Sequence, residues 1–438
     1  MLDMIKVGLF FIFMALALGA RGQSFDRINF YTHLHQNPEL SFQEENTSRL
    51  LAETWREAGF DVTQNVGGFG VVGMLRNGPG PTVMIRMDMD GLPVKEQTGL
   101  PYASEARAIE QTGQAVDVMH ACGHDIHMTV GTETALMLAK SRQNWRGTLM
   151  VIAQPAEERG AGARAMLEDG LFERFAKPDF NLALHTLATL PAGQIGFVSG
   201  WMMANVDSVD IHLKGVGGHG AYPHNAKDPV VLAASIIMDL QTLVSREIHP
   251  VAPGVVTVGS IHAGTKHNII PDKALLQLTV RSYSDSTRDT LLAGIERISI
   301  KNAEAMGFGE ALQPVVVIKD EYTPALWNDP ELVARGVAVM RRALGSENVI
   351  EVSKEMGGED FARYGRTADE IPSFMFRLGV VPEQKWQLHQ TQGEVLPSLH
   401  SPFFAPDPGP SIQAGVTAMT AMALDLFKGA QDAGFVRE

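Results

Sequence analysis

The chain has 438 residues, which predicts two or three domains at roughly 100–200 residues each. Hydrophobic residues make up 45% of the chain and charged residues 20%, so the composition excludes a disordered or fibrous protein. The formal net charge of -14 and the lack of a Lys- and Arg-rich stretch argue against nucleic-acid binding. The single cysteine, Cys122, rules out an intrachain disulfide.

Residues 1–22 are typical of an export signal. Lys6 precedes an unbroken run of 14 small and apolar residues, Val7–Ala20, and the small residues Ala20 and Gly22 predict cleavage before Gln23. A membrane anchor is the alternative, but this run would span roughly 21 Å as a helix, short of the ~30 Å hydrocarbon core of a bilayer. We therefore expect an exported protein, periplasmic or secreted, with no stable membrane anchor after signal cleavage.

Residues 23–202 are predicted to alternate between strands and helices. A helical periodicity runs through residues 37–59 and ends at Gly59. Short apolar runs bounded by Gly, Pro or charged residues predict buried strands, at Val71–Leu75, Val83–Met87, Leu149–Ala153 and Leu182–Leu184. Helical stretches lie between them, at Ile126–Lys140 and Gly162–Leu171. This alternation indicates an α/β sheet covered by helices on both faces.

Residues 203–322 show a different order of elements, strand-helix-strand-strand-helix-strand. The six segments are Val206–Lys214, Pro229–Val244, Val255–Ala263, Ala274–Ser282, Asp289–Met306 and Pro314–Asp320. This β-α-β-β-α-β order is the ferredoxin-like pattern, which forms a compact α+β unit. From Pro330 the chain returns to α/β character and ends in a helix around Ser411–Phe427. We predict one α/β domain, formed by residues 23–202 and 323–438, with a smaller domain inserted at 203–322.

One glycine motif is misleading. Gly68–Gly73 matches the dinucleotide-binding fingerprint G-x-G-x-x-G, which should follow a strand and open a helix. Here the glycines lead directly into a predicted turn at Met74–Pro79. We interpret the segment as a strand with small residues and not as a nucleotide-binding loop.

Potential ligands follow three of the predicted strands. They are Asp88 and Asp90, then Glu157 and Glu158, then His185. Ligands of open α/β sheets bind just outside the carboxyl ends of the strands, so these side chains are expected to meet in one crevice. Cys122 and His124 lie two residues apart on a non-helical stretch that enters the next helix, so both can face the same ion.

The residue types in this crevice indicate a metal site. Thiolate, imidazole and carboxylate are the usual ligands of zinc and similar divalent metals. The adjacent carboxylates of Glu157 and Glu158 repel each other unless a cation lies between them. One would bind the metal and the other would take a proton from a metal-bound water, which is the usual design for metal-assisted hydrolysis. Each residue alone would more often be structural, and the combination carries the interpretation.

The motifs also resemble a known family, the amidohydrolase branch of the di-metal peptidases. The motifs, in order, are Arg86–Pro93, Met119–Asp125, Gln154–Glu158, Leu184-His185, Gly217–His224, His267–Asp272, Gly357–Phe361 and Leu399–Pro402. This branch includes hippurate hydrolases, bacterial N-acyl-amino-acid amidohydrolases and the plant hydrolases of indole-acetyl amino acids, with aminoacylase and carboxypeptidase G as more distant relatives. The resemblance covers about residues 25–425.

The resemblance implies a zinc-peptidase-like α/β catalytic domain, with the ferredoxin-like insertion acting as a lid and dimerisation domain. It implies two divalent ions, zinc or manganese first and cobalt or nickel as alternatives, with Cys122 bridging them. The implied ligands are Cys122, His124, Glu158, His185 and His400. The resemblance also implies that Glu157 is the general base and that Asp88 is an orienting carboxylate. His219 would be the oxyanion donor, and Asn268 and His224 would contact the substrate. His219 lies in the lid, and in a homodimer it would reach the metal site of the other subunit.

The implied activity is hydrolysis of the amide bond of N-acyl amino acids to a carboxylate and a free amino acid. A dipeptidase or carboxypeptidase that uses the same site is the alternative. A third possibility is an exported binding protein that keeps the metal crevice without hydrolysing, but the intact Glu157 argues against it. One departure concerns Arg159, which stands where relatives usually carry a small residue and would either pair with Glu157 or Glu158 or face solvent.

Overall fold

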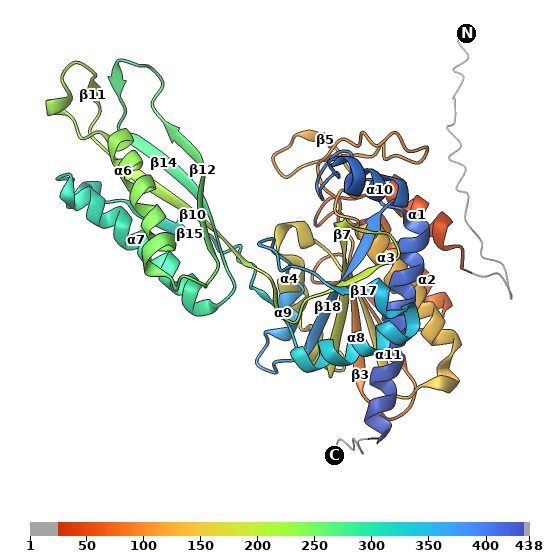
Figure 1. Cartoon of the computed structure of the whole chain (residues 1–438). Helices are drawn as coiled ribbons and strands as arrows, with labels where there is room; N and C mark the ends of the chain where they lie inside the picture. The colour runs from red at the N-terminus through yellow and green to blue at the C-terminus, as the bar shows by residue number, and fades with distance from the viewer. Residues whose placement is uncertain (1–24, 433–438) are drawn as a thin grey trace, which may run out of the picture.

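The computed structural model describes residues 25–432, so the predicted export signal at residues 1–22 lies outside the described residues. Figure 1 shows two lobes joined by a narrow connection. The small lobe comprises residues 205–318, and the large lobe is formed by the described residues on either side of this segment. The chain therefore leaves the large lobe once, builds the small lobe and returns.

The large lobe is built on an eight-stranded mixed sheet with the order β1-β2-β6-β3-β7-β18-β8-β17. The strands are β1 (Asp61–Val66), β2 (Gly70–Arg76), β3 (Thr82–Asp88), β6 (Thr148–Gln154), β7 (Phe180–Pro191), β8 (Ile195–Phe197), β17 (Val349–Glu351) and β18 (Ser373–Val381). The four central strands β6, β3, β7 and β18 are parallel to one another, and the strands on either side of them, β2 and β8, are antiparallel to this group. Every residue of β3 is buried, as expected for a parallel strand covered on both faces.

Helices cover the two faces of this sheet and create two hydrophobic cores. One face carries α1 (Arg27–Gln36), α2 (Glu45–Glu57), α3 (His124–Lys140), α8 (Pro330–Leu344) and α11 (Pro408–Asp432), and the other carries α4 (Gly162–Glu168), α5 (Leu171–Arg174) and α9 (Ala362–Gly365). Successive residues of a strand point to opposite faces. Accordingly Ile85 of β3 packs in the first core and Met84 in the second. The predicted α/β class is confirmed.

The small lobe is a four-stranded antiparallel sheet with two helices. Its strands are β10 (Asn205–Lys214), β12 (Gly254–Ala263), β14 (Lys273–Ser282) and β15 (Val315–Ile318), in the order β12-β14-β10-β15. Helices α6 (Pro229–Thr242) and α7 (Asp285–Ala305) pack together against the sheet and enclose a separate core that includes Leu232, Leu276 and Ile295. The observed order of elements is the β-α-β-β-α-β order of the sequence pattern.

Helix α6 and the turn that follows it are unusually apolar. Within the described residues, Pro229–Glu247 is the one helical segment long and apolar enough to cross a membrane, with a mean hydropathy of 1.3. A helix that packs on a sheet meets the same criteria of length and composition. Here Leu232, Ile236 and Leu240 are buried in the core of the small lobe, whereas Val231 and Met238 of the same segment are exposed.

Several element boundaries differ from those predicted. The helix expected over 37–59 begins at Glu45, because Asn37-Pro38 opens a turn, and a separate helix, α1, precedes it. Strand β7 continues well past Leu184, so His185 lies inside a strand and not at its end. Gly70–Arg76 is a strand that pairs antiparallel with β1 and β6, which agrees with the rejection of a nucleotide-binding loop.

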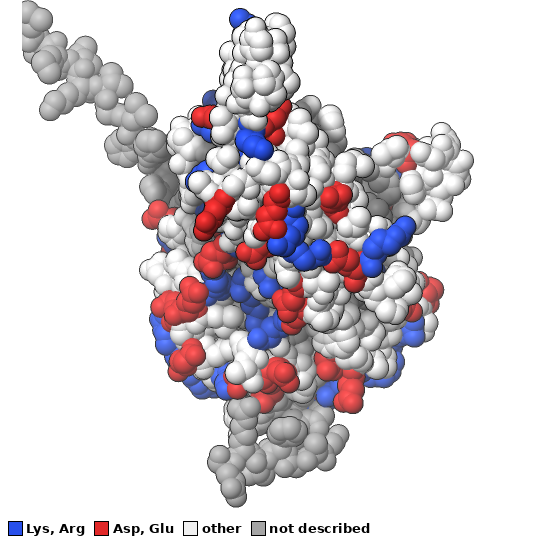
Figure 2. Space-filling view, turned by 90° about the vertical axis from the view of Figure 1, so that its left-hand side faces the viewer, with Lys and Arg blue, Asp and Glu red and all other residues white. Residues whose placement is uncertain are grey.

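The two chain crossings between the lobes lie side by side. The backbone groups of Val206 and Thr323 exchange hydrogen bonds of 2.9 and 3.1 Å, and the Ala204 amide donates to the carbonyl of Gly357 at 3.0 Å. Figure 2 views the molecule from the side of the small lobe and shows acidic and basic side chains interspersed, without a broad basic patch.

Candidate metal centre

Potential metal ligands gather at the carboxyl ends of the central strands. Cys122, His124 and His185 form one group whose ligand atoms all lie within 4.8 Å of one another, and Cys122, Glu158 and His400 form a second. The Sγ of Cys122 lies 3.5 Å from Nε2 of His185, and Nε2 of His400 lies 3.5 Å from a carboxylate oxygen of Glu158. Cys122 belongs to both groups, so the five predicted ligands come together around two adjacent positions with the thiol between them.

The turn before α3 places Cys122 and His124 in the site. Gly123 has φ +83, a left-handed conformation that glycine adopts without strain. A Cβ at this position would lie 2.8 Å from the side chain of Thr186, whose hydroxyl donates to the carbonyl of Cys122 at 2.7 Å. His124 is the first residue of α3. The glycine is therefore required both by its φ angle and by the close approach of β7.

Hydrogen bonds fix the ring orientation of two histidines. Nδ1 of His124 lies 2.8 Å from the carbonyl oxygen of Asp90, and Nδ1 of His185 lies 2.8 Å from the carbonyl oxygen of Thr186. A carbonyl oxygen only accepts, so each Nδ1 carries a proton and each Nε2 is the nitrogen left to bind a cation. Burial opposes the charged form of His124, but Asp88 and Asp90 raise its pKa to about 10, so a cation would displace a proton from its Nε2. Nε2 of His124 is buried and has no hydrogen-bond partner among the described residues, as expected for an atom placed to bind a metal.

The side chain of Asp90 holds the backbone of Glu157 and Glu158. One carboxylate oxygen of Asp90 accepts from the amide of Glu157 and the other from the amide of Glu158, each at 3.0 Å, and Ser41 donates a further bond of 2.6 Å. The preceding residue, Ala156, has a left-handed φ of 50. Strain of this kind persists where surrounding contacts determine the backbone, as they do at functional sites.

The electrostatics of the cluster favour a bound cation. Burial, together with the neighbouring carboxylates of Glu359 and Glu158, raises the pKa of Glu157 well above its usual value. Burial raises the pKa of Glu158 to about 8, and it raises the pKa of the Cys122 thiol, with Glu158 and Glu157 adding to the effect. Divalent cations at this position would reverse these shifts, because they favour the carboxylate and thiolate forms. The donor set fits that interpretation, as does the buried Oε1 of Glu158, which accepts no hydrogen bond from residues 25–432.

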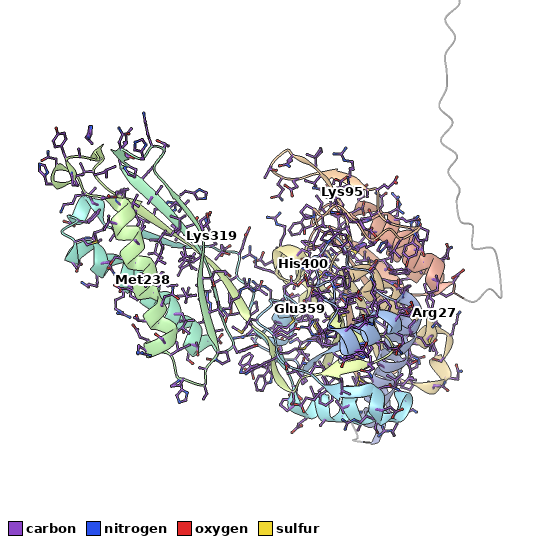
Figure 3. All side chains as sticks on the ribbon, turned by 45° about the horizontal axis from the view of Figure 1, so that its top comes forward. Arg27, Lys95, Met238, Lys319, Glu359 and His400 are labelled. Atoms are coloured by element: carbon purple, nitrogen blue, oxygen red, sulfur yellow. The ribbon has the colours of Figure 1, made fainter. Side chains whose placement is uncertain are left out.

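His400 comes from a loop far along the chain. Its backbone is left-handed, with φ 65, and its amide donates to the carbonyl of Ala121 at 2.9 Å. This bond ties the His400 loop to the turn that carries Cys122. Figure 3 shows His400 and Glu359 on the side of the large lobe that faces the small lobe. Only the family resemblance indicated His400, since a histidine in a proline-rich loop carries no signal of its own.

Asp88 lies at the end of β3 and organises the groups behind the cluster. Its carboxylate accepts from Nδ1 of His127 at 2.7 Å and from Arg86 at 2.7 Å, and it lies 3.6 Å from Nε2 of His124. His127, one turn further along α3 than His124, was not predicted. Nor were Glu359 and Asp360, whose carboxylates pair with Arg86 at 2.9 and 3.1 Å.

The structure does not bring the predicted lid residues to the metal cluster. His219 lies in β11 (Gly218–His219) and is exposed, and β11 is at the end of the small lobe remote from the large lobe (Figure 1). β11 pairs with β13 (Ile269–Ile270), and the carbonyl of Asn268 accepts from the amide of Gly220 at 2.9 Å. His224 follows in a short 3-10 turn. The three side chains therefore share one end of the small lobe.

Arg159 does not pair with the glutamates beside it. Its guanidinium lies 3.6 Å from the carboxylate of Glu321, at the connection between the lobes. Of the two alternatives predicted for Arg159, pairing with Glu157 or Glu158 is not observed, and the side chain is partly exposed to solvent at the end of the 3-10 turn Glu157–Arg159. Arg159 lines a cavity of about 610 Å³ that opens over Cys122, Glu157 and His400.

The comparison with known families agrees with this geometry. Residues 84–397 match the model of Peptidase family M20/M25/M40. The chain belongs to this family. The match includes the turn that carries Cys122 and His124 and the whole small lobe, and it ends three residues before His400.

Relatives within the M20/M25/M40 family are similar over most of their length. The hippurate hydrolase of Campylobacter jejuni is 37% identical over 330 residues, 75% of this chain and 82% of the relative. Thermostable carboxypeptidase 2 of Saccharolobus solfataricus is 36% identical over 356 residues, 80% of this chain and 85% of the relative. The crystal structure of a Bacillus subtilis dinuclear metal-binding peptidase from the M20 family has a TM-score of 0.74 and 29% identity, covering 92% of this chain and 98% of that one.

Proposed function

We propose that this member of the M20/M25/M40 family is a metal-dependent amidohydrolase that cleaves N-acyl amino acids to a carboxylate and a free amino acid. The observation that carries the proposal is the pair Glu157 and Glu158, held by Asp90 beside a thiol shared between two groups of metal donors. The relation to a hippurate hydrolase at 37% identity supports an N-acyl amino acid as the substrate.

The side chains of the site divide the chemistry between them. Five residues would hold two divalent cations, namely Cys122, His124, Glu158, His185 and His400. When bound, such cations acidify a water molecule and polarise the amide carbonyl. The carboxylate of Glu157 then takes the proton of the attacking water and delivers it to the leaving nitrogen. Glu157 lines the cavity beside His124 and Glu158, so its carboxylate is placed to reach a water molecule there.

The small lobe supplies the remaining roles in this proposal. His219 would donate to the oxyanion that develops at the carbonyl, with Asn268 and His224 in contact with the substrate. Because all three lie far from Glu157 in this conformation, either closure of the small lobe or the tip of a second copy must bring them to the cavity. We propose a homodimer through the small lobe as one arrangement that would achieve this.

The ligand types favour zinc or manganese, with cobalt and nickel as alternatives. The proposed compartment is extracytoplasmic, either periplasmic or secreted, on the basis of residues 1–22. The proposed partners are small amides. The proposal includes no nucleic-acid partner, in keeping with a net charge of -14. It also includes no stable membrane anchor after signal cleavage.

Replacement of Glu157 tests the proposal directly. The purified protein, stripped with a chelator and reloaded with zinc or manganese, should release free amino acid from hippurate and related N-acyl amino acids. Glu157→Gln should lower kcat by about 10³-fold or more, since it removes the proton acceptor, while the bound metal content measured by atomic absorption stays unchanged. Glu168→Gln, on an exposed glutamate of α4, is the matched control. Turnover retained by Glu157→Gln would remove Glu157 from the role of base.

A carboxypeptidase or dipeptidase activity at the same site is the second candidate, because the carboxypeptidase of Saccharolobus solfataricus is 36% identical. A free dipeptide assayed beside its N-acylated counterpart separates the two functions. Preference for the dipeptide would favour the peptidase. Absence of turnover with every metal, on a folded protein that binds metal, would favour a binding protein.

A further inference from the structure

Arg377 is a buried cation in the wall of the cavity beside the metal centre. It lies on β18, directly across from His185 on the neighbouring strand β7, and its side chain is 2% exposed. One nitrogen of its guanidinium, Nη2, donates to the carboxylate of Glu355 at 2.6 Å. The other, Nη1, is buried and has no hydrogen-bond partner among the described residues. A buried donor without an acceptor loses its hydration without compensation. The observed geometry therefore leaves Nη1 in need of an acceptor from outside the described residues.

The ion pair with Glu355 does not account for this geometry. A guanidinium offers a planar fork of N–H groups that matches a carboxylate with two parallel hydrogen bonds. Arg377 uses only one side of its fork on Glu355, whose own side chain is 42% exposed and accessible to water. In a purely structural ion pair, we would expect the buried member to have all its N–H groups hydrogen-bonded. Here the buried member, Arg377, is the one that keeps a free N–H.

The charges around the cavity leave room for an anion at this wall. Glu359 pairs with Arg86 at 2.9 Å, a guanidinium that it shares with two other carboxylates, and Arg159 pairs with Glu321 at 3.6 Å. Arg281, which also lines the cavity, forms no ion pair within residues 25–432 and donates to the carbonyl of Met356 at 3.1 Å. The acidic metal cluster at one end is therefore faced by guanidinium groups with unused capacity for a carboxylate.

We propose that Arg377 binds a carboxylate of the substrate through Nη1 and thereby sets the preference of the enzyme for anionic amides. The inference rests on the amidohydrolase function proposed above and adds the group that recognises the substrate's charge. The carboxylate has two possible sources, the α-carboxylate of the released amino acid or the free end of a dicarboxylic acyl group such as succinyl. Both lie within a few bonds of the amide that the metal centre attacks.

Matched substrates and variants test the role of Arg377. The substrates are N-acetylalanine, N-succinylalanine and N-ethylacetamide, which keeps the amide but has no carboxylate. Arg377→Met should raise KM for the recognised anionic substrate by about 10-fold to 100-fold, with little change for N-ethylacetamide, and Arg377→Lys should restore part of the loss. Arg363→Met removes another partly buried guanidinium that does not line the cavity and serves as the control.

The pattern across the substrates identifies the source of the carboxylate. A loss on N-acetylalanine assigns Arg377 to the α-carboxylate, and a loss confined to N-succinylalanine assigns it to the acyl group. An equal loss on all three substrates would overturn the proposal, because it would show that Arg377 only supports the fold. If the wild-type protein hydrolyses none of them, the amidohydrolase function fails, and calorimetric titration of the metal-loaded protein with the same compounds tests Arg377 alone.

Glu355 provides a second test with the opposite sign, which holds even if Arg377→Met does not fold. Glu355→Gln removes the competing negative charge at Nη2 and keeps an amide oxygen as a neutral acceptor, so the substrate becomes the only carboxylate that competes for Arg377. KM for the recognised anion should fall several-fold while KM for N-ethylacetamide stays constant. An unchanged or higher KM for both anionic substrates in Glu355→Gln would contradict the proposal.

Discussion

Single side chains in this protein often act through a residue far away in the sequence. Asp90 positions two glutamates more than 60 residues later, and Asp360 contacts Arg86 across 274 positions. The sequence suggested Cys122, His124 and the glutamate pair because their residue types and spacing are unusual by themselves. It could not indicate Asp90 as a backbone anchor, nor Arg377, because those roles exist only once separate strands lie side by side.

A buried charge network behind the metal cluster gives a pH-dependent prediction. His35 lies 2.7 Å from Asp125 and 3.2 Å from Glu96. Burial opposes its charged form, but the hydrogen bonds to Asp125 and Glu96 outweigh this and raise the pKa of His35 from 6.5 to about 9. The group is therefore more easily protonated in the folded state, and its contribution to stability is complete below pH 6.5 and lost as the pH rises through about 9.

His35→Gln should therefore lower the free energy of unfolding by up to about 3 kcal/mol at pH 6, and the difference from the wild type should shrink by pH 10. Urea denaturation at both pH values measures it. His33→Gln, on the exposed side of the same helix, is the control. A difference that does not depend on pH would show that His35 contributes by packing and not by charge.

At the scale of elements, the central strands were predictable and their limits were less so. Runs such as Val83–Met87 have the composition of strands buried on both faces, and the structure confirms a strand there. The helix boundary near Glu45 was missed because the periodic pattern continues through a turn. His185 was expected at a strand end, but β7 extends past it, since β18 continues alongside and pairs with it.

The start of α3 depends on one glycine, which yields a prediction for the metal centre. Gly123→Ala places a Cβ 2.8 Å from Thr186 at a φ of +83, so the turn that carries Cys122 and His124 must shift. We expect a loss of about 1–3 kcal/mol in stability and a weaker metal affinity by about 10-fold or more, measured by competition with a chromophoric chelator. Gly113→Ala, at φ +84 with no atom within 4 Å, imposes the same backbone strain without the contact. Equal metal affinities for the two variants would contradict the role of Gly123.

At the scale of the molecule, the two lobes have separate hydrophobic cores. Leu276 and Ile295 belong to the core of the small lobe, and Ile85 and Phe374 to a core of the large lobe. The metal donors all belong to the large lobe. The two lobes should therefore respond differently to conditions that affect the cations.

Removal of metal should destabilise the large lobe alone. Chelation leaves buried carboxylates and a thiol without their counter-ions, and loss of a ligand held at 100 times its Kd corresponds to about 2.7 kcal/mol. We expect scanning calorimetry to show two transitions, of which the one from the large lobe falls by about 5 °C or more on chelation. Leu276→Ala identifies the small-lobe transition by lowering it selectively. A single transition, or an equal shift of both, would show that the lobes unfold as one unit.

The pairing of β7 with β18 has a consequence for biosynthesis. Asn181 of β7 lies beside Ser373 of β18, and the whole small lobe lies between them in the chain. A ribosome therefore completes β10, α6, β12, β14, α7 and β15 before β18 emerges, while β7 already has its other partner, β3. Domains generally fold as units in the order of their synthesis. We expect the small lobe to reach its native state on the nascent chain while one edge of the main sheet is still open, so that the metal centre is the last part of the molecule to form.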